Sequence, residues 1–335
     1  MRNRRRSIMR PCGALAAGLM AVVAAACVPP GVAGPNLPPG TPGGAVSCPM
    51  LPADNIWNTR VDTLPLDPSS AAYVATIGAT ATMHADFGSG LWNGGPIGIP
   101  YVVVNAGQPK VAVQFRVASE SNPGPYPIPP NAPIEGGAGS SGDRHVLVVD
   151  KGTCRLYELF SAYPNGDGSW RAYSGAVFDL RSNALRPDTW TSAEAAGFPI
   201  LPGLVRYDEV ASGVIRHAIR FTAPQTRDAH VWPATHDASS LTGAQYPPMG
   251  QRFRLKAGFD ESSYSPQVQV ILRAMKTYGI VLADNGSPWF ISGAPDARWN
   301  NTVLHELHRV PGSAFEAVDV RGLQVAPRSG QARQP

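Results

Sequence analysis

The sequence lacks the short motifs that most often identify an enzyme's chemistry. It has no Gly-x-Ser-x-Gly nucleophile elbow, no His-Glu-x-x-His helix and no phosphate-binding Gly-Lys-Ser/Thr loop. The segment Gly88-Ser89-Gly90 does not have the flanking pattern of the elbow. Motif-based assignment to the α/β-hydrolases, the zinc proteases or the P-loop NTPases therefore has no support.

Charge is scarce and nearly balanced. Charged residues make up 16% of the 335 residues, and part of the net charge of +4 comes from an Arg-rich N-terminus. No basic stripe with interleaved aromatic residues is present, so we expect no nucleic-acid partner. The chain is long enough to bury a substantial core, as one large domain or as two smaller ones.

The N-terminus has no apolar run long enough to favour a membrane-spanning helix. Residues 1–26 instead read as an export signal, with arginines followed by the short apolar run from Ala14 to Ala26. Ala24-Ala25-Ala26-Cys27 resembles a lipobox without its usual Leu, which predicts lipidation of Cys27 and a cell-surface lipoprotein held at the membrane through that lipid. The alternative is ordinary cleavage and full secretion. Arg5-Arg6 also resembles a twin-arginine signal, so the export route stays open.

Cysteine use agrees with export. Cys12 and Cys27 belong to the signal, which leaves Cys48 and Cys154. In an oxidising compartment two cysteines most simply form one disulfide, and two buried thiols are the alternative. Around them we expect a Pro/Gly-rich linker over 27–46, a single β-rich domain over 47–320 and a disordered polar tail over 321–335.

The composition favours strands joined by turns. With 35 Gly and 34 Pro, the chain is poorly suited to a mainly helical protein. One convincing helix is predicted over 265–278, opened by Ser265-Pro266 and stopped by Gly279. Asp284-Asn285-Gly286-Ser287 predicts a hairpin between the apolar runs on either side. We therefore expect a mainly β protein, with a β-sandwich or jelly-roll-like body and one packed amphipathic helix, α+β overall.

The best candidate site begins with two neighbouring strands, over 145–149 and 154–160. If Lys151-Gly152 forms a two-residue turn, His145 faces Glu158 at the end of an apolar face. His217 also falls on an apolar strand face, because Ile215, Ile219 and Phe221 share its alternation.

These three residues suggest two chemistries. His145, Glu158 and His217 could bind a divalent metal, which is the only cofactor that the sequence indicates. Without metal, Glu158 could set the tautomer of His145 so that the imidazole acts as a general base. The alternative is a hydrogen bond that merely closes the end of the sheet.

Other segments could complete such a site. His84 and Asp86 lie two residues apart, so in an extended segment both side chains point the same way, although an Asp in a Gly-rich loop often caps a turn. The loop over 121–141 holds six prolines and leads directly to His145, which suggests a lid or the wall of a cleft. Seven tryptophans could stack on sugar rings, or they could be core residues.

Several stretches resemble a group of uncharacterised secreted bacterial proteins. The resemblance covers about Leu51 to Asp319 and implies one coherent secreted domain, but it carries no established activity and no catalytic residues. The similar stretches are Gly142-Asp143-Arg144-His145, Leu156-Tyr157-Glu158-Leu159, the segments over 202–210 and 278–286, and Ile291-Ser292-Gly293-Ala294-Pro295.

Two functions follow as hypotheses. The first is a secreted or surface-tethered glycan-active enzyme, a glycoside hydrolase or a polysaccharide lyase, with catalytic residues among His145, Glu158, His217, His84 and Asp86. A hydrolase would need a second, suitably spaced carboxylate. The alternative is a non-catalytic surface module that binds a polysaccharide or serves a structural role.

Overall fold

The computed structural model describes residues 48–335. All of these described residues belong to one compact unit. The predicted export signal, the lipidation site Cys27 and the linker over 27–46 lie outside the described residues. Within residues 48–335, no helix is both long and apolar enough to cross a membrane.

Strands dominate the described residues, so the predicted mainly β, α+β class is confirmed. The strands form four sheets, and parallel pairs occur beside antiparallel ones. The strands are β1 (His84–Asp86), β2 (Leu91–Trp92), β3 (Gly95–Pro96), β4 (Tyr101–Val104), β5 (Val113–Phe115), β6 (Val146–Asp150), β7 (Arg155–Phe160), β8 (Tyr163–Pro164), β9 (Trp170–Ala172), β10 (Ser174–Asp179), β11 (Ile219–Ala223), β12 (Arg252–Leu255), β13 (Ile280–Asn285), β14 (Phe290–Ser292) and β15 (Phe315–Val318). The α-helices are α1 (Ser70–Ile77), α2 (Tyr207–Ala211), α3 (Pro266–Thr277) and α4 (Asn301–Leu304), and the 3₁₀ turns are η1 (Ile56–Asn58), η2 (Ala118–Glu120), η3 (Leu201–Gly203), η4 (His305–Arg309), η5 (Gly312–Ala314) and η6 (Arg321–Leu323).

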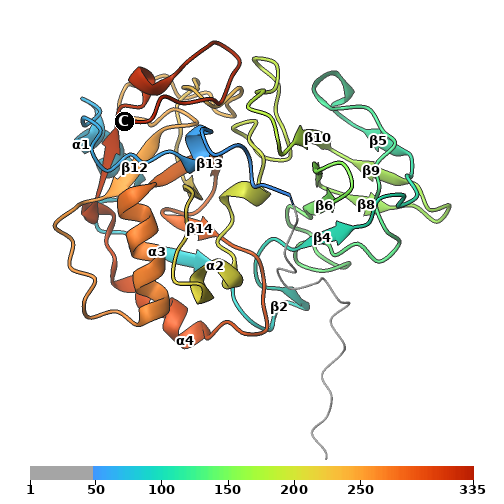
Figure 1. The fold of residues 1–335 in the computed structure, drawn as a ribbon, viewed down its shortest axis with the longest axis horizontal. Helices are drawn as coiled ribbons and strands as arrows, with labels where there is room; N and C mark the ends of the chain where they lie inside the picture. Colours follow the sequence, from blue (N-terminus) through green and yellow to red (C-terminus); the bar gives the residue numbers. More distant parts are fainter. Residues whose placement is uncertain (1–47) are drawn as a thin grey trace, which may run out of the picture. The chain divides into compact units, whose positions relative to one another are not determined.

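The largest sheet has six strands in the order β1-β14-β11-β13-β12-β15. Helix α3 lies beside it and supplies the core residues Val268, Ile271 and Met275, as its helical spacing predicts (Figure 1). Its boundaries also agree with the sequence. Pro266 occupies the first helical position, and Gly279 follows the helix with a φ of +74°, a conformation that glycine adopts at little cost.

The hairpin expected around Asp284-Asn285-Gly286-Ser287 is wrong. β13 and β14 flank this turn as predicted, but they are not neighbours, because β11 lies between them. β11 has a buried residue on each face, and its Phe221 stacks on the ring of Trp289. Burying the apolar face of β11, which carries Ile219, Phe221 and Ala223, yields more free energy than closing a local two-stranded turn, so the tertiary arrangement prevails.

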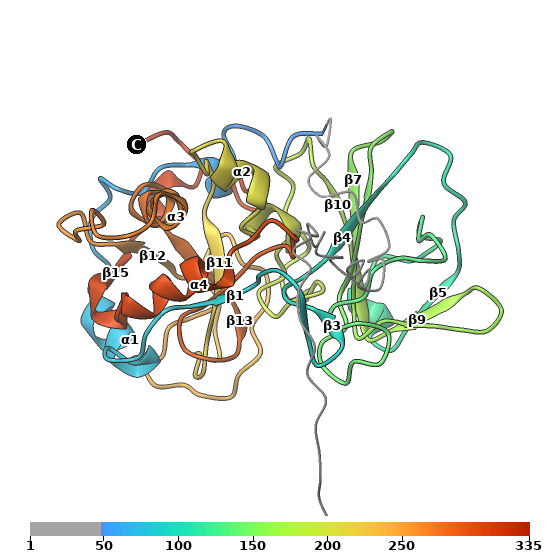
Figure 2. The same cartoon turned by 90° about the horizontal axis from the view of Figure 1, so that it is seen from below.

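The second sheet has the order β10-β7-β6-β4 and lies beside the first, as two perpendicular views agree (Figure 1, Figure 2). Its antiparallel strands β6 and β7 are the two expected from the sequence, and β10 pairs with β7 in the same antiparallel manner. The predicted register of β6 and β7 is shifted by two residues, however, because Leu147 is paired with Glu158 and Asp150 with Arg155. The turn is longer than expected, since the Asp150 carboxylate accepts hydrogen bonds from Gly152 N and Thr153 Oγ1.

The predicted disulfide between Cys48 and Cys154 is confirmed. The two Cα atoms are 5.4 Å apart, and the bridge joins residues separated by 106 positions. It ties the beginning of the described chain to the turn between β6 and β7. A bridge of this kind typically contributes about 2 to 4 kcal/mol to the free energy of unfolding.

The polar tail over 321–335, expected to be disordered, is packed against the domain. It contains η6 and forms isolated bridges between Gln324 and Ala332 and between Asn55 and Gln331. Leu323 and Ala332 are buried. Its polar composition hides this order, because backbone hydrogen bonds such as Gly330 N to Asn183 O and Ala332 N to Asp54 O hold the tail on the domain.

Candidate active site

Two buried cations, His145 and Arg220, lie among six acidic side chains. We call these eight residues the carboxylate cluster. They come from both large sheets and from the loops between them, and electrostatic influence on one another's pKa values connects them. The acidic members are Asp86, Glu135, Asp143, Glu158, Glu194 and Asp284.

His145 is held as a cation. Its Nδ1 lies 2.6 Å from Oε2 of Glu135, and its Nε2 lies 2.9 Å from the carbonyl oxygen of Ala193. Both partners are acceptors, so both ring nitrogens carry protons. Burial lowers the pKa of His145, but the charge and hydrogen bond of Glu135 outweigh burial and raise that pKa to about 9.

This raised pKa does not favour the predicted role of His145 as a general base at neutral pH. Its partner is Glu135 rather than Glu158, because the register shift moves Glu158 opposite Leu147. An imidazolium has no lone pair with which to accept a proton or bind a metal. The side chain is only 3% exposed, so it acts on its neighbours through its charge.

Glu158 is completely buried and anchors a backbone turn. Its carboxylate accepts hydrogen bonds from the N–H groups of Ile200 and Leu201, at 2.9 to 3.0 Å. Burial is the largest influence and raises the pKa of Glu158 to about 7, despite these hydrogen bonds. Glu158 thus fixes the segment that enters η3 and has no exposed surface with which to meet a substrate.

Changing Glu158 to Gln should make the free energy of unfolding depend less on pH between pH 5 and pH 8. In the folded protein Glu158 keeps its proton up to about pH 7, whereas its ordinary pKa is 4.5. Its contribution to stability is therefore fully present below pH 4.5 and is lost as pH rises through 7. Between pH 5 and pH 8 we expect the free energy of unfolding of the variant to rise by up to about 3 kcal/mol relative to the wild type.

Urea denaturation of both proteins at a series of pH values would measure this difference. Because the charge of His145 acts on Glu158, the difference between the two proteins reports the titration of Glu158 together with its coupling to His145. A constant difference between the two proteins from pH 5 to pH 8 would show that Glu158 is ionised throughout.

Arg220 is the second buried cation. Its Nε donates to Oε2 of Glu194 at 2.6 Å, and its Nη1 donates to the hydroxyl of Ser292. Glu194 is fully buried, and its Oε1 has no hydrogen-bond partner among the described residues. Burial raises the pKa of Glu194, and the nearby charge of Asp284 adds to this rise. Arg220 is the central positive charge that makes so many acidic groups tolerable in one region.

Asp86 and Glu135 are the two members that face solvent with opposite pKa shifts. Partial desolvation, and then the charges of Glu135 and Asp143, raise the pKa of Asp86. Burial alone would raise the pKa of Glu135, but the charge and hydrogen bonds of His145 outweigh it, and the net shift is downward. Asp86 is exposed, and the side chain of Glu135 is 23% exposed. A carboxyl whose pKa is raised, in the field of one whose pKa is lowered, is the pattern expected of an acid–base pair.

The loop over 121–141 positions Glu135. Its Tyr126 and Ile128 are buried in a hydrophobic cluster with Tyr157 and Leu159, so this loop is a packed wall rather than a loose lid. The backbone N–H of Glu135 donates to the carbonyl of His145 at 3.0 Å, which sets the two side chains beside each other.

Arg144 fixes the same loop from the other side. It adopts a φ of +54°, and its guanidinium donates to the carbonyls of Ala138 and Ser140 at 2.8 Å. Non-glycine residues in this conformation are uncommon and cluster at functional sites. Its neighbours Asp143 and His145 both belong to the carboxylate cluster.

The structure brings together three of the five predicted catalytic residues. Asp86, His145 and Glu158 belong to the carboxylate cluster, whereas His84 and His217 do not. His217 contacts the carbonyl oxygen of Ala218 through Nδ1 and the carboxylate of Glu209 through Nε2. Both of its ring nitrogens are therefore engaged away from His145. The predicted metal set of His145, Glu158 and His217 is not assembled in residues 48–335.

A different group, Glu135, Asp143 and His145, places ligand atoms within 4.8 Å of one another. Two carboxylates and an imidazole could hold a divalent metal if His145 lost a proton. Because both of its nitrogens face acceptors and its pKa is raised to about 9, His145 does not favour this role at neutral pH.

Sequence reasoning missed Glu135, Glu194, Arg220 and Asp284. Arg220 could have been found, because it is a charged residue between the apolar residues Ile219 and Phe221 of a predicted strand and would need a partner if that strand were buried. Asp284 was assigned to turn formation, which it also performs through its hydrogen bond to Asn285 N. Glu135 carries no local signal, since only the packing of its Pro-rich loop brings it to His145.

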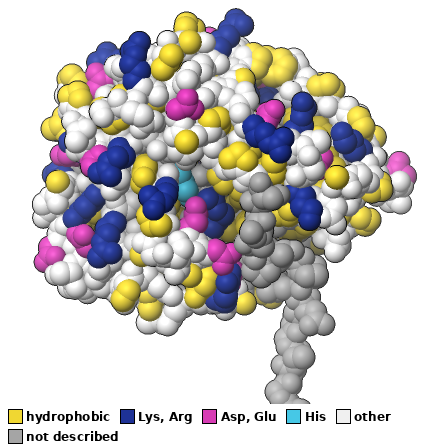
Figure 3. Space-filling model, in the orientation of Figure 1, with side chains coloured by type: hydrophobic (Ala, Val, Ile, Leu, Met, Phe, Trp, Pro, Cys, Tyr) yellow, Lys and Arg dark blue, Asp and Glu magenta, His cyan; other side chains and the backbone are white. Residues whose placement is uncertain are grey.

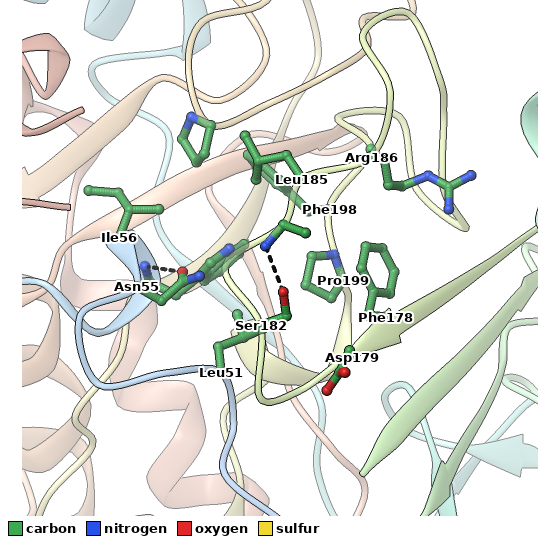
Figure 4. A pocket seen from close by; sticks show the side chains of 14 residues that line it. Leu51, Asn55, Ile56, Phe178, Asp179, Ser182, Leu185, Arg186, Phe198 and Pro199 are labelled. Carbon is green, nitrogen blue, oxygen red and sulfur yellow. Dashed lines mark hydrogen bonds between the residues drawn. The ribbon is translucent and has the colours of Figure 1, made fainter. Parts of the chain in front are cut away.

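Surface hollows lie elsewhere on the domain. The one in Figure 4 is lined by Leu51, Phe178, Leu185 and Phe198, and its cavity volume of about 30 Å³ holds no more than about two water molecules. An adjoining hollow near Arg155 and Arg186 has a volume of about 250 Å³. Neither includes Asp86, Glu135 or Asp143. On the face drawn in Figure 3, basic and acidic side chains are interspersed.

No protein-family model matches the sequence, and neither the curated proteins nor the solved structures gave a match. The function of the protein is therefore inferred from the geometry and electrostatics of the site itself.

Proposed function

We propose that this protein is a secreted or surface-tethered glycoside hydrolase in which Asp86 is the general acid and Glu135 is the base or nucleophile. The observation that carries this proposal is the pair of solvent-facing carboxyl groups with opposite pKa shifts. Export and attachment through a lipid on Cys27 belong to the same proposal and are supported by the N-terminal sequence.

Glycoside hydrolysis needs a proton for the leaving oxygen and a carboxylate on the other side of the bond. Asp86, with its raised pKa, donates that proton. Glu135, held ionised by His145, either activates water or attacks the anomeric carbon. The buried charges of His145 and Arg220 need not move during the reaction, so they form a preorganised field around the developing charge.

A lyase is less well supported by this geometry. A lyase needs a base that accepts a proton from the sugar ring, and His145 as an imidazolium cannot do so. The alternative of a non-catalytic binding module draws support from the ion pairing within the carboxylate cluster, because buried ion pairs also occur as structural features.

An exposed tryptophan supports a sugar ligand. Trp92 is 73% exposed and lies on the β2–β3 hairpin, where it pairs with Gly95. Gly95 packs so closely on Gly136, the neighbour of Glu135, that an added Cβ would lie 1.9 Å from the Gly136 carbonyl carbon. The indole is thus carried by a hairpin fixed to the catalytic loop, where it can stack on a pyranose ring.

Changing Trp92 to Ala should raise KM for a polysaccharide by about 2- to 12-fold and leave kcat nearly unchanged, because a stacking contact binds the ground and transition states alike. Steady-state kinetics would measure this. Leu91→Ala is the matched control, since Leu91 is 48% exposed on the same hairpin and has no aromatic ring. Equal kinetics for the wild type and both variants would show that the indole of Trp92 does not contact the substrate.

A screen of polysaccharides would test the proposed reaction. A hydrolase releases new reducing ends without an unsaturated product, whereas a lyase gives the ultraviolet absorbance of a conjugated double bond. Binding without either product would favour the non-catalytic module.

A further inference from the structure

We propose that the hollow lined by Arg155 and Arg186 binds the carboxylate of a uronic acid residue, so that the substrate of the proposed hydrolase is an acidic polysaccharide. We call it the arginine hollow. Its wall combines the beginning of β7, the end of β10 and the loop that follows β10. Its volume of about 250 Å³ is just below the roughly 300 to 1,000 Å³ of typical small-molecule sites, which suits one sugar-sized ligand.

Arg186 is a buried cation without a carboxylate partner. The residue is 6% exposed, and its guanidinium donates to the carbonyls of Thr191 and Glu120 and to Oδ1 of Asn122, at 2.6 to 2.7 Å. All three acceptors are uncharged, and no ion pair of the described chain includes Arg186. Burial lowers the pKa of Arg186 to about 10, and the charges around it do not offset that effect. Such a cation gains more from an added anion than one that is already paired.

The arginine hollow offers unused hydrogen-bond donors. A guanidinium has five N–H groups, and the three bonds of Arg186 leave one on each terminal nitrogen. Asn122 accepts through Oδ1 from Arg186 and from Val177 N, while its amide nitrogen donates to no group within residues 48–335. Arg155 is exposed, and its side chain forms no hydrogen bond or ion pair in this part of the chain. Two guanidinium groups and an amide that line one hollow can therefore bind a carboxylate.

Asp179 favours an acidic sugar over a simple inorganic anion. It lines the same hollow, and its Oδ1 accepts the backbone N–H of Arg181. Its negative charge repels sulfate or phosphate, but a carboxylate also accepts hydrogen bonds from hydroxyl groups, which a sugar ring supplies and these ions lack. The apolar side chains of Val177, Phe178 and Leu185 complete the lining and can pack against the carbon atoms of the ring. A uronic acid residue thus matches the basic, acidic and apolar parts of the hollow together.

A short segment joins the arginine hollow to the carboxylate cluster. Arg186 donates to the carbonyl of Thr191, and two residues later the carbonyl of Ala193 accepts from His145. A uronate at Arg186 would therefore bind next to the segment that fixes His145, as suits a polysaccharide that contacts the protein beyond its cleaved bond. The assignment of a polysaccharide substrate rests on the proposed hydrolysis, whereas binding of a uronate requires only the hollow.

The test is a calorimetric titration of the Asp86→Asn protein, which should not consume its ligand, with trimers of galacturonic acid and of glucuronic acid and with the neutral galactose and glucose trimers. At least one uronate trimer should saturate the protein and bind about tenfold or more tightly than its neutral counterpart. A further Arg155→Gln change should weaken uronate binding about tenfold. Arg186→Gln should weaken it too, but that change also breaks three buried bonds, so the exposed Arg155 gives the cleaner measurement. Arg181→Gln is the matched control, because Arg181 is exposed beside Asp179 and does not line the hollow.

The proposal is overturned if neither uronate trimer saturates the protein at millimolar concentration, or if the neutral trimers bind as tightly. It is also overturned if Arg155→Gln binds like Arg181→Gln, or if sulfate binds as tightly as the uronate trimers, since the hollow would then take a simple inorganic anion. Uronate binding without cleavage of any polysaccharide would support the arginine hollow and count against the hydrolase. Cleavage of a neutral polysaccharide without uronate binding would support the hydrolase and overturn the hollow's assignment.

Discussion

Changing Asp86 to Asn is expected to lower kcat on a cleaved polysaccharide by about 10²- to 10⁴-fold, the usual contribution of a positioned general acid. The amide keeps the size of the side chain but cannot donate a proton of comparable acidity to the glycosidic oxygen. Because Asp86 is exposed and forms no buried ion pair, the free energy of unfolding should change little. Reducing-end kinetics together with urea denaturation would separate the two effects.

Asp167→Asn serves as the matched control. Asp167 is an exposed acid in the turn between β8 and β9, where it bonds to Ser169, and its replacement should leave kcat unchanged. If Asp86→Asn retained full activity while Glu135→Gln abolished it, the general acid would be another group. Full activity in both variants would exclude the carboxylate pair as the catalytic machinery.

The pH profile of the wild type gives a second view of the same pair. Activity requires Glu135 ionised and Asp86 protonated. The pKa of Glu135 is lowered, so the acidic limb should lie below the usual range of a glutamate, and the raised pKa of Asp86 should set the alkaline limb. Asp86→Asn should remove the alkaline limb from any residual activity.

The sequence predicted local structure better than tertiary pairing. Helix α3 was found because its capping residues and apolar spacing act over a few residues. The hairpin at Asp284 was wrong because β11, more than fifty residues earlier in the chain, inserts between the two strands. No local signal encodes such an insertion, since it depends on which apolar surfaces are available to be buried together.

The candidate site shows the same limit. The alternation of β6 and β7 correctly placed His145 and Glu158 on one face, because a register shift of two residues leaves every side chain on the same side of the sheet. The predicted register was wrong by two residues, because the side chain of Asp150 stabilises a longer turn. That shift replaced Glu158 with Glu135 as the partner of His145 and changed the predicted base into a cation.

Changing Arg220 to Met is expected to have the largest effect on stability, a loss of about 3 to 5 kcal/mol in the free energy of unfolding. Met fills a similar volume but leaves Glu194 and Asp284 without their buried counter-charge. Arg298→Met is the control. Arg298 pairs with Asp208 and Asp296 at the surface, where the loss should be about 0 to 1 kcal/mol.

A double variant, Arg220→Met with Glu194→Gln, tests whether the loss comes from the orphaned charge. Removing both partners should restore part of the stability, because the carboxylate of Glu194 is then gone and only Asp284 still lacks its counter-charge. Urea denaturation of the two single variants and the double variant completes the thermodynamic cycle. Losses that simply add would show that Arg220 stabilises the sheet through packing and its bond to Ser292, and not by balancing the charge of Glu194.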